Sequence, residues 1–314
     1  MLISIGIPAY NSERHLRSTL QSVIDQSFGD WELIIVNDGS KDKTAEILTE
    51  FEALDPRIIA VAQANAGIAA ARNRAYAEMS PSSKYVMFLD HDDILKPGSL
   101  EKLYSALSAD DGAVAAYGQP EFIDGDGTVL ARHPIPGYVP ENRLRVSGNS
   151  IVTMDQSAPT DFAVFAAGDS IITPGMALIR KSAYDAAGGW DPDVNLKGCD
   201  DLDLWFRLTL LGHICFLPDK VLQYRLHATN TSSNVKMMRR SERCVRRKVL
   251  AICEKMPERR RELQIGYRKK ELKIASDKFN FALAQCKSAK VSSAAREAAY
   301  GVAHLIRGFR GLSV

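Results

Sequence analysis

The chain has 314 residues, of which 46% are hydrophobic and 25% charged, the proportions of an ordinary globular protein. No stretch approaches the roughly 18 consecutive apolar residues of a membrane-spanning helix. The N-terminus shows neither a basic leader nor a cleavage-site pattern, so we expect no signal peptide. The formal charge of +2 hides an asymmetry, because residues 235–314 hold 21 Lys and Arg against 7 Asp and Glu. An acidic body with a basic tail predicts two parts with different roles.

The cysteines are odd in number and form no CxxC pair. This pattern predicts free thiols in a reducing compartment and argues against a disulfide framework or a zinc site. The five are Cys199, Cys215, Cys244, Cys253 and Cys286.

Short apolar runs alternate with amphipathic stretches from the first residue onward. The runs expected to be strands are residues 2–7, 32–36, 58–62, 85–89 and 113–117. The stretches with helical spacing are residues 13–26, 43–54, 68–79 and 98–107. Repeated strand–helix units with almost wholly apolar strands predict an α/β fold, with a mostly parallel sheet covered by helices on both faces.

After residue 120 the alternation weakens. Residues 122–130 predict a hairpin with an Asp-Gly turn, and residues 132–160 predict a long or mobile loop. Helix–strand order is expected to resume around Met176 and to continue in residues 181–187, 201–211 and 214–216. From about Ser241 the chain is predicted to be helical and basic, with breaks at Pro257 and Gly266.

Polar clusters follow the predicted strands, at the sheet edge where parallel sheets bind ligands. The clusters are residues 8–11, 37–40 and 90–93, and a fourth, residues 199–205, begins a predicted helix. Three like charges directly after the apolar run YVMFL repel one another and resist desolvation, so something must offset them. Asp90 and Asp92 suit one hard divalent cation.

Each cluster also has a structural explanation. Asp38 could shape a turn and cap the next helix, and Asp93 could be a helix cap as well. The acids Asp200, Asp201 and Asp203 could simply favour the positive end of a helix dipole.

Five segments together form a specific pattern. They are IPAYNSERHLRSTLQSVIDQSFGDWELIIVNDGSKDKT, NAGIAAARNRA, YVMFLDHDDIL, GGWDPDVNLKGCDDLDLWFRLTLLG and YRLH. In this order and at this spacing they resemble the motifs of the family 2 glycosyltransferases of the GT-A fold, a Rossmann-like fold that binds nucleotide-diphospho-sugars. The resemblance covers roughly residues 1–230. It implies a catalytic domain in residues 1–234, with a nucleotide-binding half up to about residue 119 and an acceptor half after it, followed by a basic helical region in residues 235–314.

The resemblance also implies nucleotide contacts. Pro8 and Tyr10 would follow the first strand at the nucleotide base, and Asp38 of the NDGS turn would contact the base as well. Arg72 would approach the nucleotide, and Asp90, the first acid of the DxD motif, would hold the ribose.

Metal and catalytic roles follow from the same resemblance. Asp92 would bind the Mn²⁺ or Mg²⁺ that holds the diphosphate. His227 would be a further metal ligand or a phosphate contact, although His-Ala-Thr stands where the family has His-Pro-Gly. Asp201 would be the general base, and Asp200 replaces the glutamate usual beside it. Trp190 would contact the substrate, or else be a core residue behind a glycine turn.

The chemistry of these residue types agrees with the implied roles. A divalent cation stabilises the charge that builds on a departing diphosphate, and a carboxylate can deprotonate an acceptor hydroxyl. A single carboxylate opposite the leaving group predicts inversion. We therefore expect an inverting, metal-dependent hexosyl- or N-acetylhexosaminyl-transferase. It would use a nucleotide-diphospho-sugar, with a UDP-sugar favoured, and extend a saccharide or lipid-linked acceptor in cell-surface polysaccharide or glycolipid synthesis.

Two other functions compete with this expectation. A sugar-phosphate nucleotidyltransferase shares the sheet type, but that class opens with a glycine-rich, basic loop, which residues 8–11 are not. A nucleotide-sugar-binding or scaffold protein that has lost turnover would fit the replacement at Asp200.

The basic tail has three interpretations. It could pack on the catalytic domain, or meet an anionic membrane surface, with residues 299–314 dipping into the interface. Nucleic-acid binding ranks last because no recognition motif is present. We expect a cytoplasmic protein, either free or peripheral at the inner face of the membrane.

Overall fold

The structure is a computed structural model that describes residues 2–131, 143–155, 157–168, 170–227, 230–287 and 291–310. Its strands are β1 (Ile3–Ala9), β2 (Trp31–Asn37), β3 (Ile58–Ala62), β4 (Tyr85–Phe88), β5 (Ile94–Leu95), β6 (Ala113–Ile123), β7 (Leu144–Ser147), β8 (Ser150–Thr153), β9 (Ala177–Arg180) and β10 (His213–Arg225). Its helices are α1 (Leu16–Ile24), α2 (Thr44–Leu54), α3 (Ile68–Glu78), α4 (Ser99–Ser108), α5 (Phe162–Ala167), α6 (Lys181–Ala187), α7 (Asp200–Thr209), α8 (Val235–Ile252), α9 (Pro257–Lys287) and α10 (Val291–Arg310).

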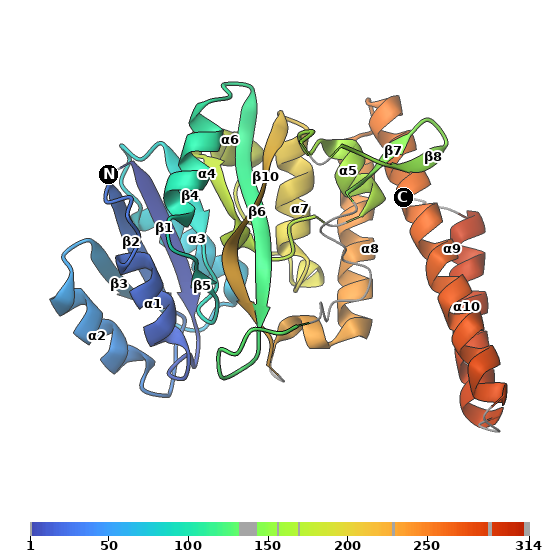
Figure 1. Ribbon diagram of the computed structural model, residues 1–314, viewed down its shortest axis with the longest axis horizontal. Coiled ribbons are helices and arrows are strands. Elements are labelled where there is room, and N and C mark those ends of the chain that lie inside the picture. Colours follow the sequence, from blue (N-terminus) through green and yellow to red (C-terminus); the bar gives the residue numbers. More distant parts are fainter. Residues whose placement is uncertain are drawn as a thin grey trace.

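An eight-stranded sheet with the order β3-β2-β1-β4-β9-β6-β10-β5 forms the centre of the molecule (Figure 1). The sheet is mostly parallel, as predicted, and only β5 and β9 run against their neighbours. Every residue of β1 and β2 is buried, because α1 covers one face of the sheet and α3 the other (Figure 1). This double cover explains why these strands are apolar throughout instead of alternating.

The predicted strands and the first four predicted helices are confirmed, with ends displaced by a few residues. The sheet extends beyond the prediction at β6 and β10, which pair in parallel from His213 with Ala113 to Arg225 with Ile123. The expected hairpin after β6 is a short turn closed by a single bridge between Ile123 and Val129. Part of the expected loop instead forms the β7–β8 hairpin, and residues 132–142 of that loop lie outside the described residues.

The basic tail forms helices, as predicted, but the prediction of a break at Gly266 was wrong. Gly266 lies inside α9, at the point where this helix crosses α5. A Cβ at this position would lie 1.7 Å from the carbonyl oxygen of Ala166, so glycine permits the close approach of the two helices. Arg246 of α8 donates a hydrogen bond to the same carbonyl at 3.3 Å. Two tail helices therefore pack on the end of α5. No helix within the described ranges combines the length and the apolar character needed to cross a bilayer.

Replacing Gly266 with alanine tests this packing. In an open helix interior the change would stabilise the protein by about 0.5–1 kcal/mol, whereas here we expect a loss of about 1–3 kcal/mol from overpacking. The free energy of unfolding in urea measures the difference, and Ser276→Ala, at an exposed position of α9, is the control. A Gly266→Ala protein as stable as the wild type would contradict the helix crossing described here.

Candidate active site

The predicted polar clusters meet at one edge of the sheet, because β1, β2, β4 and β10 all end there. The backbone N–H of Asp38, directly after β2, donates to the carbonyl of Ala9 at the end of β1, at 2.8 Å. Asp90 follows β4, and its carboxylate reaches Arg72 of α3. Parallel strands align their carboxyl ends, so residues far apart in sequence share this edge.

Asp38 organises the loop that leads into α3. Its carboxylate accepts hydrogen bonds from the Gln63 side chain at 2.8 Å and from the backbone N–H groups of Ala66 and Gly67 at 2.8 and 2.9 Å. Tyr10 is 46% exposed and presents its ring at the same edge, whereas Pro8 is buried within β1. The turn thus combines a fixed carboxylate with an accessible aromatic ring.

Arg72 joins two acidic clusters that are distant in sequence. One guanidinium nitrogen donates to Asp90 Oδ1 and another to Asp200 Oδ2, each at 2.6 Å. The guanidinium is 4% exposed and lies over the Trp190 ring, 4.4 Å from the ring centroid. Burial alone would lower the pKa of Arg72, but Asp90 and Asp200 outweigh burial and raise that pKa above its ordinary value. The arginine therefore stays charged and holds the first acid of each cluster.

Asp92 has a different partner, His227. The distance between Asp92 Oδ2 and His227 Nε2 is 2.8 Å. Burial raises the pKa of the Asp92 carboxyl, but the hydrogen bond with His227 and the charges of His91 and His227 together outweigh burial, and the pKa lies below its ordinary value. Cis ligands of an octahedral Mn²⁺ or Mg²⁺ ion lie about 3 Å apart, so this carboxylate and imidazole fit two positions around such an ion.

Asp93 is not the helix cap that we expected, because α4 begins after Gly98. Its carboxylate is buried and accepts from the Arg225 backbone N–H at 3.0 Å and from the Thr173 hydroxyl at 3.1 Å. Burial raises the pKa of Asp93 well above its ordinary value, and the neighbouring Asp92 and Asp90 raise it further. Sequence reasoning missed Thr173, which lies in no recognised motif, and gave no role to Arg225, although Arg225 lies within the YRLH segment.

Asp200 and Asp201 occupy different environments in the first turn of α7. Asp200 is buried against Arg72, whereas Asp201 is partly exposed. Burial raises the pKa of Asp200, with the Arg72 charge opposing it. The accessible carboxylate of the pair is thus Asp201.

Trp190 lies beneath Arg72 and is 2% exposed. Its ring meets the edge of Phe88 at 5.2 Å between centroids. The indole offers no free face to a sugar, so the structure favours the core-packing explanation over the expected substrate contact.

A cleft of about 600 Å³ opens beside Asp92. Basic residues, histidines, two acids and two uncharged polar residues line the cleft. They are Asn11, Ser12, Glu13, Arg14, His15, Lys41, Asp42, His91 and His227. The His15 ring stacks on His227 with 5.4 Å between centroids. Sequence reasoning did not single out Arg14, His15 or Lys41. The signal available was their place in the turns that follow the first two strands, where ligand contacts of parallel sheets concentrate.

The chain matches a known family and known proteins. Residues 4–188 match the model described as glycosyl transferase family 2. The putative teichuronic acid biosynthesis glycosyltransferase TuaG of Bacillus subtilis is 43% identical over 102 residues, which are 32% of this chain and 40% of that protein. Glycosyltransferase GlyA of Streptococcus pneumoniae is 38% identical over 125 residues, 40% of this chain and 18% of GlyA. An uncharacterized glycosyltransferase of Rickettsia prowazekii is 28% identical over 74% of this chain and 66% of its own length.

Solved structures share the fold. TarS residues 1–349 of Staphylococcus aureus, in complex with UDP-GlcNAc, superpose with a TM-score of 0.63 and 16% identity, over 98% of this chain and 81% of that one. The mannosyltransferase PcManGT of Pyrobaculum calidifontis, in complex with GDP-Man and Mn²⁺, gives 0.57 and 14%, over 96% and 75%. At these identities the likeness shows the fold alone, which is the GT-A fold.

We expect a large loss in the free energy of unfolding when the positive charge of Arg72 is removed. Replacing Arg72 with methionine leaves Asp90 and Asp200 without their shared partner, and breaking a buried pair in this way costs about 3–5 kcal/mol. We expect that loss in urea unfolding, with much of it recovered when Asp200→Asn is added. Arg74→Met, on the same helix, removes an exposed pair with Glu78 and should cost no more than about 0.5 kcal/mol. Equal costs for the two substitutions would contradict the network.

Proposed function

Because the chain belongs to glycosyl transferase family 2, we propose that it is an inverting, divalent-metal-dependent glycosyltransferase. It moves a hexosyl or N-acetylhexosaminyl group from a nucleotide-diphospho-sugar to a hydroxyl of a saccharide or lipid-linked acceptor. The observation that carries the proposal is the meeting of Arg72, Asp90 and Asp200 beside Asp92 and His227. In this proposal Asp92 and His227 would hold the ion, and Asp201, the partly exposed neighbour of Asp200, would serve as the base.

The donor side of the site binds the nucleotide. Tyr10 offers an exposed ring for the base, and Asp38 is fixed by the loop before α3 so that a remaining lone pair can accept from the base. Asp90 Oδ1 accepts a hydrogen bond from Arg72. Asp90 Oδ2 lies 3.3 Å from the Thr173 hydroxyl and can accept a hydrogen bond from a ribose hydroxyl. Asp92 and His227 would hold Mn²⁺ or Mg²⁺, and a bound dication supplies Lewis-acid stabilisation of the leaving diphosphate.

The acceptor side needs a base. Asp201 is accessible and stands in the first turn of α7, so it can take the proton of an acceptor hydroxyl as the new bond forms. Asp200 acts by position, since its bond to Arg72 fixes the start of α7. Asp200, although shorter than the glutamate usual at this position, still lies 2.6 Å from the Arg72 guanidinium. The replacement keeps this contact, which argues against the scaffold alternative. A base on the face opposite the diphosphate leads to inversion.

The donor and the pathway are inferred from relatives. TarS binds UDP and UDP-GlcNAc, and PcManGT binds GDP-Man with Mn²⁺, which supports a nucleotide-sugar donor and favours UDP. TuaG is named for teichuronic acid biosynthesis, and a relative from Pasteurella multocida is named chondroitin synthase. These names support a role in building a cell-surface polysaccharide. We propose that the enzyme extends such a polysaccharide or a glycolipid at the cytoplasmic side of the membrane.

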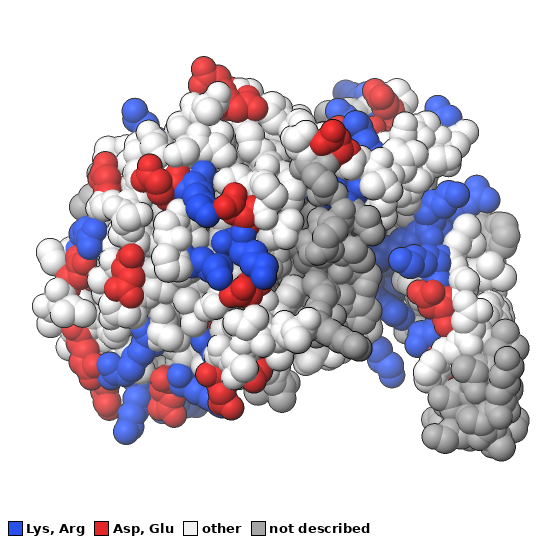
Figure 2. Space-filling view, viewed as in Figure 1, with Lys and Arg blue, Asp and Glu red and all other residues white. Residues whose placement is uncertain are grey.

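Residues 235–314 form a region that docks on the catalytic domain, residues 1–234, and meets an anionic membrane surface. Exposed Lys and Arg gather beside α9 (Figure 2), whereas both signs of charge mix over the sheet-bearing part. The exposed bases of α8 and α9 include Arg247, Arg261, Arg268, Lys269 and Lys273. Each basic residue near an anionic surface contributes about 1 kcal/mol, so the cluster suits an enzyme whose acceptor is lipid-linked.

A nucleotide panel tests the proposed activity. Thermal unfolding is followed with UDP, GDP, dTDP and CMP, each with and without Mn²⁺, on the wild type, Asp92→Ala and Asp201→Asn. We expect one nucleotide to raise the wild-type Tm with Mn²⁺, because a ligand at a hundred times its Kd stabilises the folded state by about 2.7 kcal/mol. Asp92→Ala should lose the benefit of the metal.

Turnover of the donor identified in this way separates catalysis from binding. Asp201→Asn should keep the nucleotide shift and lose about 10²–10⁴-fold in turnover, the usual contribution of a general base. Asp277→Asn, at an exposed position of α9, should change neither. If no nucleotide shifts the Tm, the donor site is wrong; if binding occurs without wild-type turnover, the scaffold alternative takes its place.

Vesicle binding tests the membrane contact. Changing Arg268, Lys269 and Lys273 to glutamate should lower the affinity for phosphatidylglycerol vesicles, measured by co-sedimentation, by at least about 100-fold. Binding to phosphatidylcholine vesicles should change little. The control reverses three exposed bases of the catalytic domain, Arg17, Lys84 and Lys102. Equal losses in both variants would point to net charge alone and would remove the specific role of the tail.

A further inference from the structure

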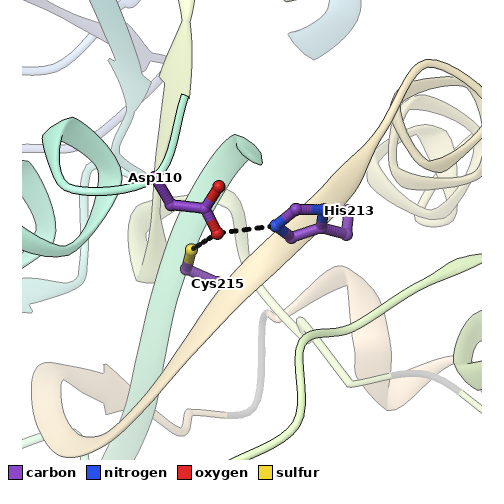
Figure 3. A group of neighbouring side chains, drawn as sticks. All are labelled: Asp110, His213 and Cys215. Carbon is purple, nitrogen blue, oxygen red and sulfur yellow. Dashed lines mark hydrogen bonds and ion pairs between the residues drawn. The ribbon is translucent and has the colours of Figure 1, made fainter. Parts of the chain in front are cut away.

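A second group of ligand-forming side chains lies away from the candidate active site. His213 and Cys215 belong to the first residues of β10, and Asp110 lies in the turn between α4 and β6 (Figure 3). The active-site residues Arg225 and His227 lie at the other end of β10. A strand of this length spans roughly 40 Å, so the two groups sit at opposite ends of the sheet.

The three side chains converge on one point. Asp110 Oδ2 is 2.8 Å from His213 Nε2 and 3.7 Å from Cys215 Sγ, and all three ligand atoms lie within 4.8 Å of one another. The ligands of a tetrahedral Zn²⁺ ion, at its usual bond lengths, lie about 3.3–3.6 Å apart. Small side-chain adjustments would therefore bring the group to that geometry.

The backbone prepares this arrangement. His213 and Cys215 are two residues apart at the start of β10, where the register with β6 shifts between His213 and Ile214, and both side chains reach Asp110. Asp110 is held in place: Gly112 N–H donates to Oδ1 at 3.0 Å, and Arg180 donates to its carbonyl oxygen at 3.0 Å. One carboxylate oxygen is thereby fixed by the turn, and the other is turned toward the thiol and the imidazole. Such orientation of a ligand by its own hydrogen bonds is typical of metal sites.

The geometry is that of a ligand set and not of a thiol nucleophile. In a cysteine-based catalytic arrangement the imidazole lies between thiol and carboxylate. Here the carboxylate lies between the other two groups (Figure 3). A cysteine binds a metal ion as the thiolate, so an incoming ion would displace the thiol proton of Cys215.

We propose that Asp110, His213 and Cys215 bind one Zn²⁺ ion, with water completing the tetrahedron. One thiolate, one imidazole and one carboxylate together suit this borderline ion better than the hard Mn²⁺ or Mg²⁺. The ion ties the α4–β6 turn to the start of β10. The ion would fix the beginning of the strand whose far end, at Arg225, donates to the backbone carbonyl of Asp92.

Metal content and stability test the site without reference to activity. The purified full chain is stripped of metal, titrated with Zn²⁺ and analysed for bound zinc and for Tm. We expect one zinc per chain and a raised Tm in the wild type. In Cys215→Ser and His213→Ala the affinity for zinc should fall at least tenfold. The matched thiol control is Cys244→Ser, which changes a half-buried cysteine of α8 and should behave as the wild type does.

Asp92→Ala distinguishes this site from the proposed catalytic one. It should keep its zinc and lose its response to Mn²⁺ with nucleotide, whereas Cys215→Ser should do the reverse. Circular dichroism checks that each variant is folded. If Cys215→Ser does not fold, Co²⁺ added to Asp92→Ala gives a second answer, because thiolate-bound cobalt has a charge-transfer band. Absence of that band, zinc binding that survives Cys215→Ser, or zinc lost in Asp92→Ala would each overturn the proposal.

Discussion

The candidate site depends on the two ion pairs that the buried guanidinium of Arg72 forms. The guanidinium bonds Asp90, at the end of β4, and Asp200, at the start of α7, and these two residues come from different halves of the chain. Buried carboxylates without a partner are costly, so the burial of Asp90 and Asp200 at this edge depends on Arg72. With the arginine present, the two clusters are joined through Asp90 and Asp200, and Asp201, next to Asp200, remains partly exposed.

The three aspartates after β4 are accommodated in three different ways. Asp90 has the permanent charge of Arg72, and Asp92 has the titratable imidazole of His227. Asp93 has neutral donors, Thr173 and the Arg225 backbone, and its pKa is raised by burial and by its acidic neighbours. Asp92 is thus the acid of the three whose partner, His227, lines the cleft.

The tail helices show how packing can override a local signal. Gly266 was expected to break a helix, as isolated glycines weaken helices in water. Instead it lies where α9 crosses α5, and the carbonyl oxygen of Ala166 leaves no room for a Cβ there. Arg246 of α8 donates a hydrogen bond to the same carbonyl. The basic region is thus packed on the body, where α8 contacts α7 and α9 contacts α5, while other bases of these helices stay exposed.

The sequence by itself determined the order of strands and helices, the acids at the strand ends and the family motifs, because these depend on near neighbours along the chain. Only the tertiary structure decided that Asp93 is not a cap, that Trp190 is buried, and that Asp110 meets His213 from 103 positions away. The physical reason is that side-chain partners are set by which strands lie side by side. A parallel sheet brings together the ends of strands that are distant in sequence, and no local pattern records that pairing.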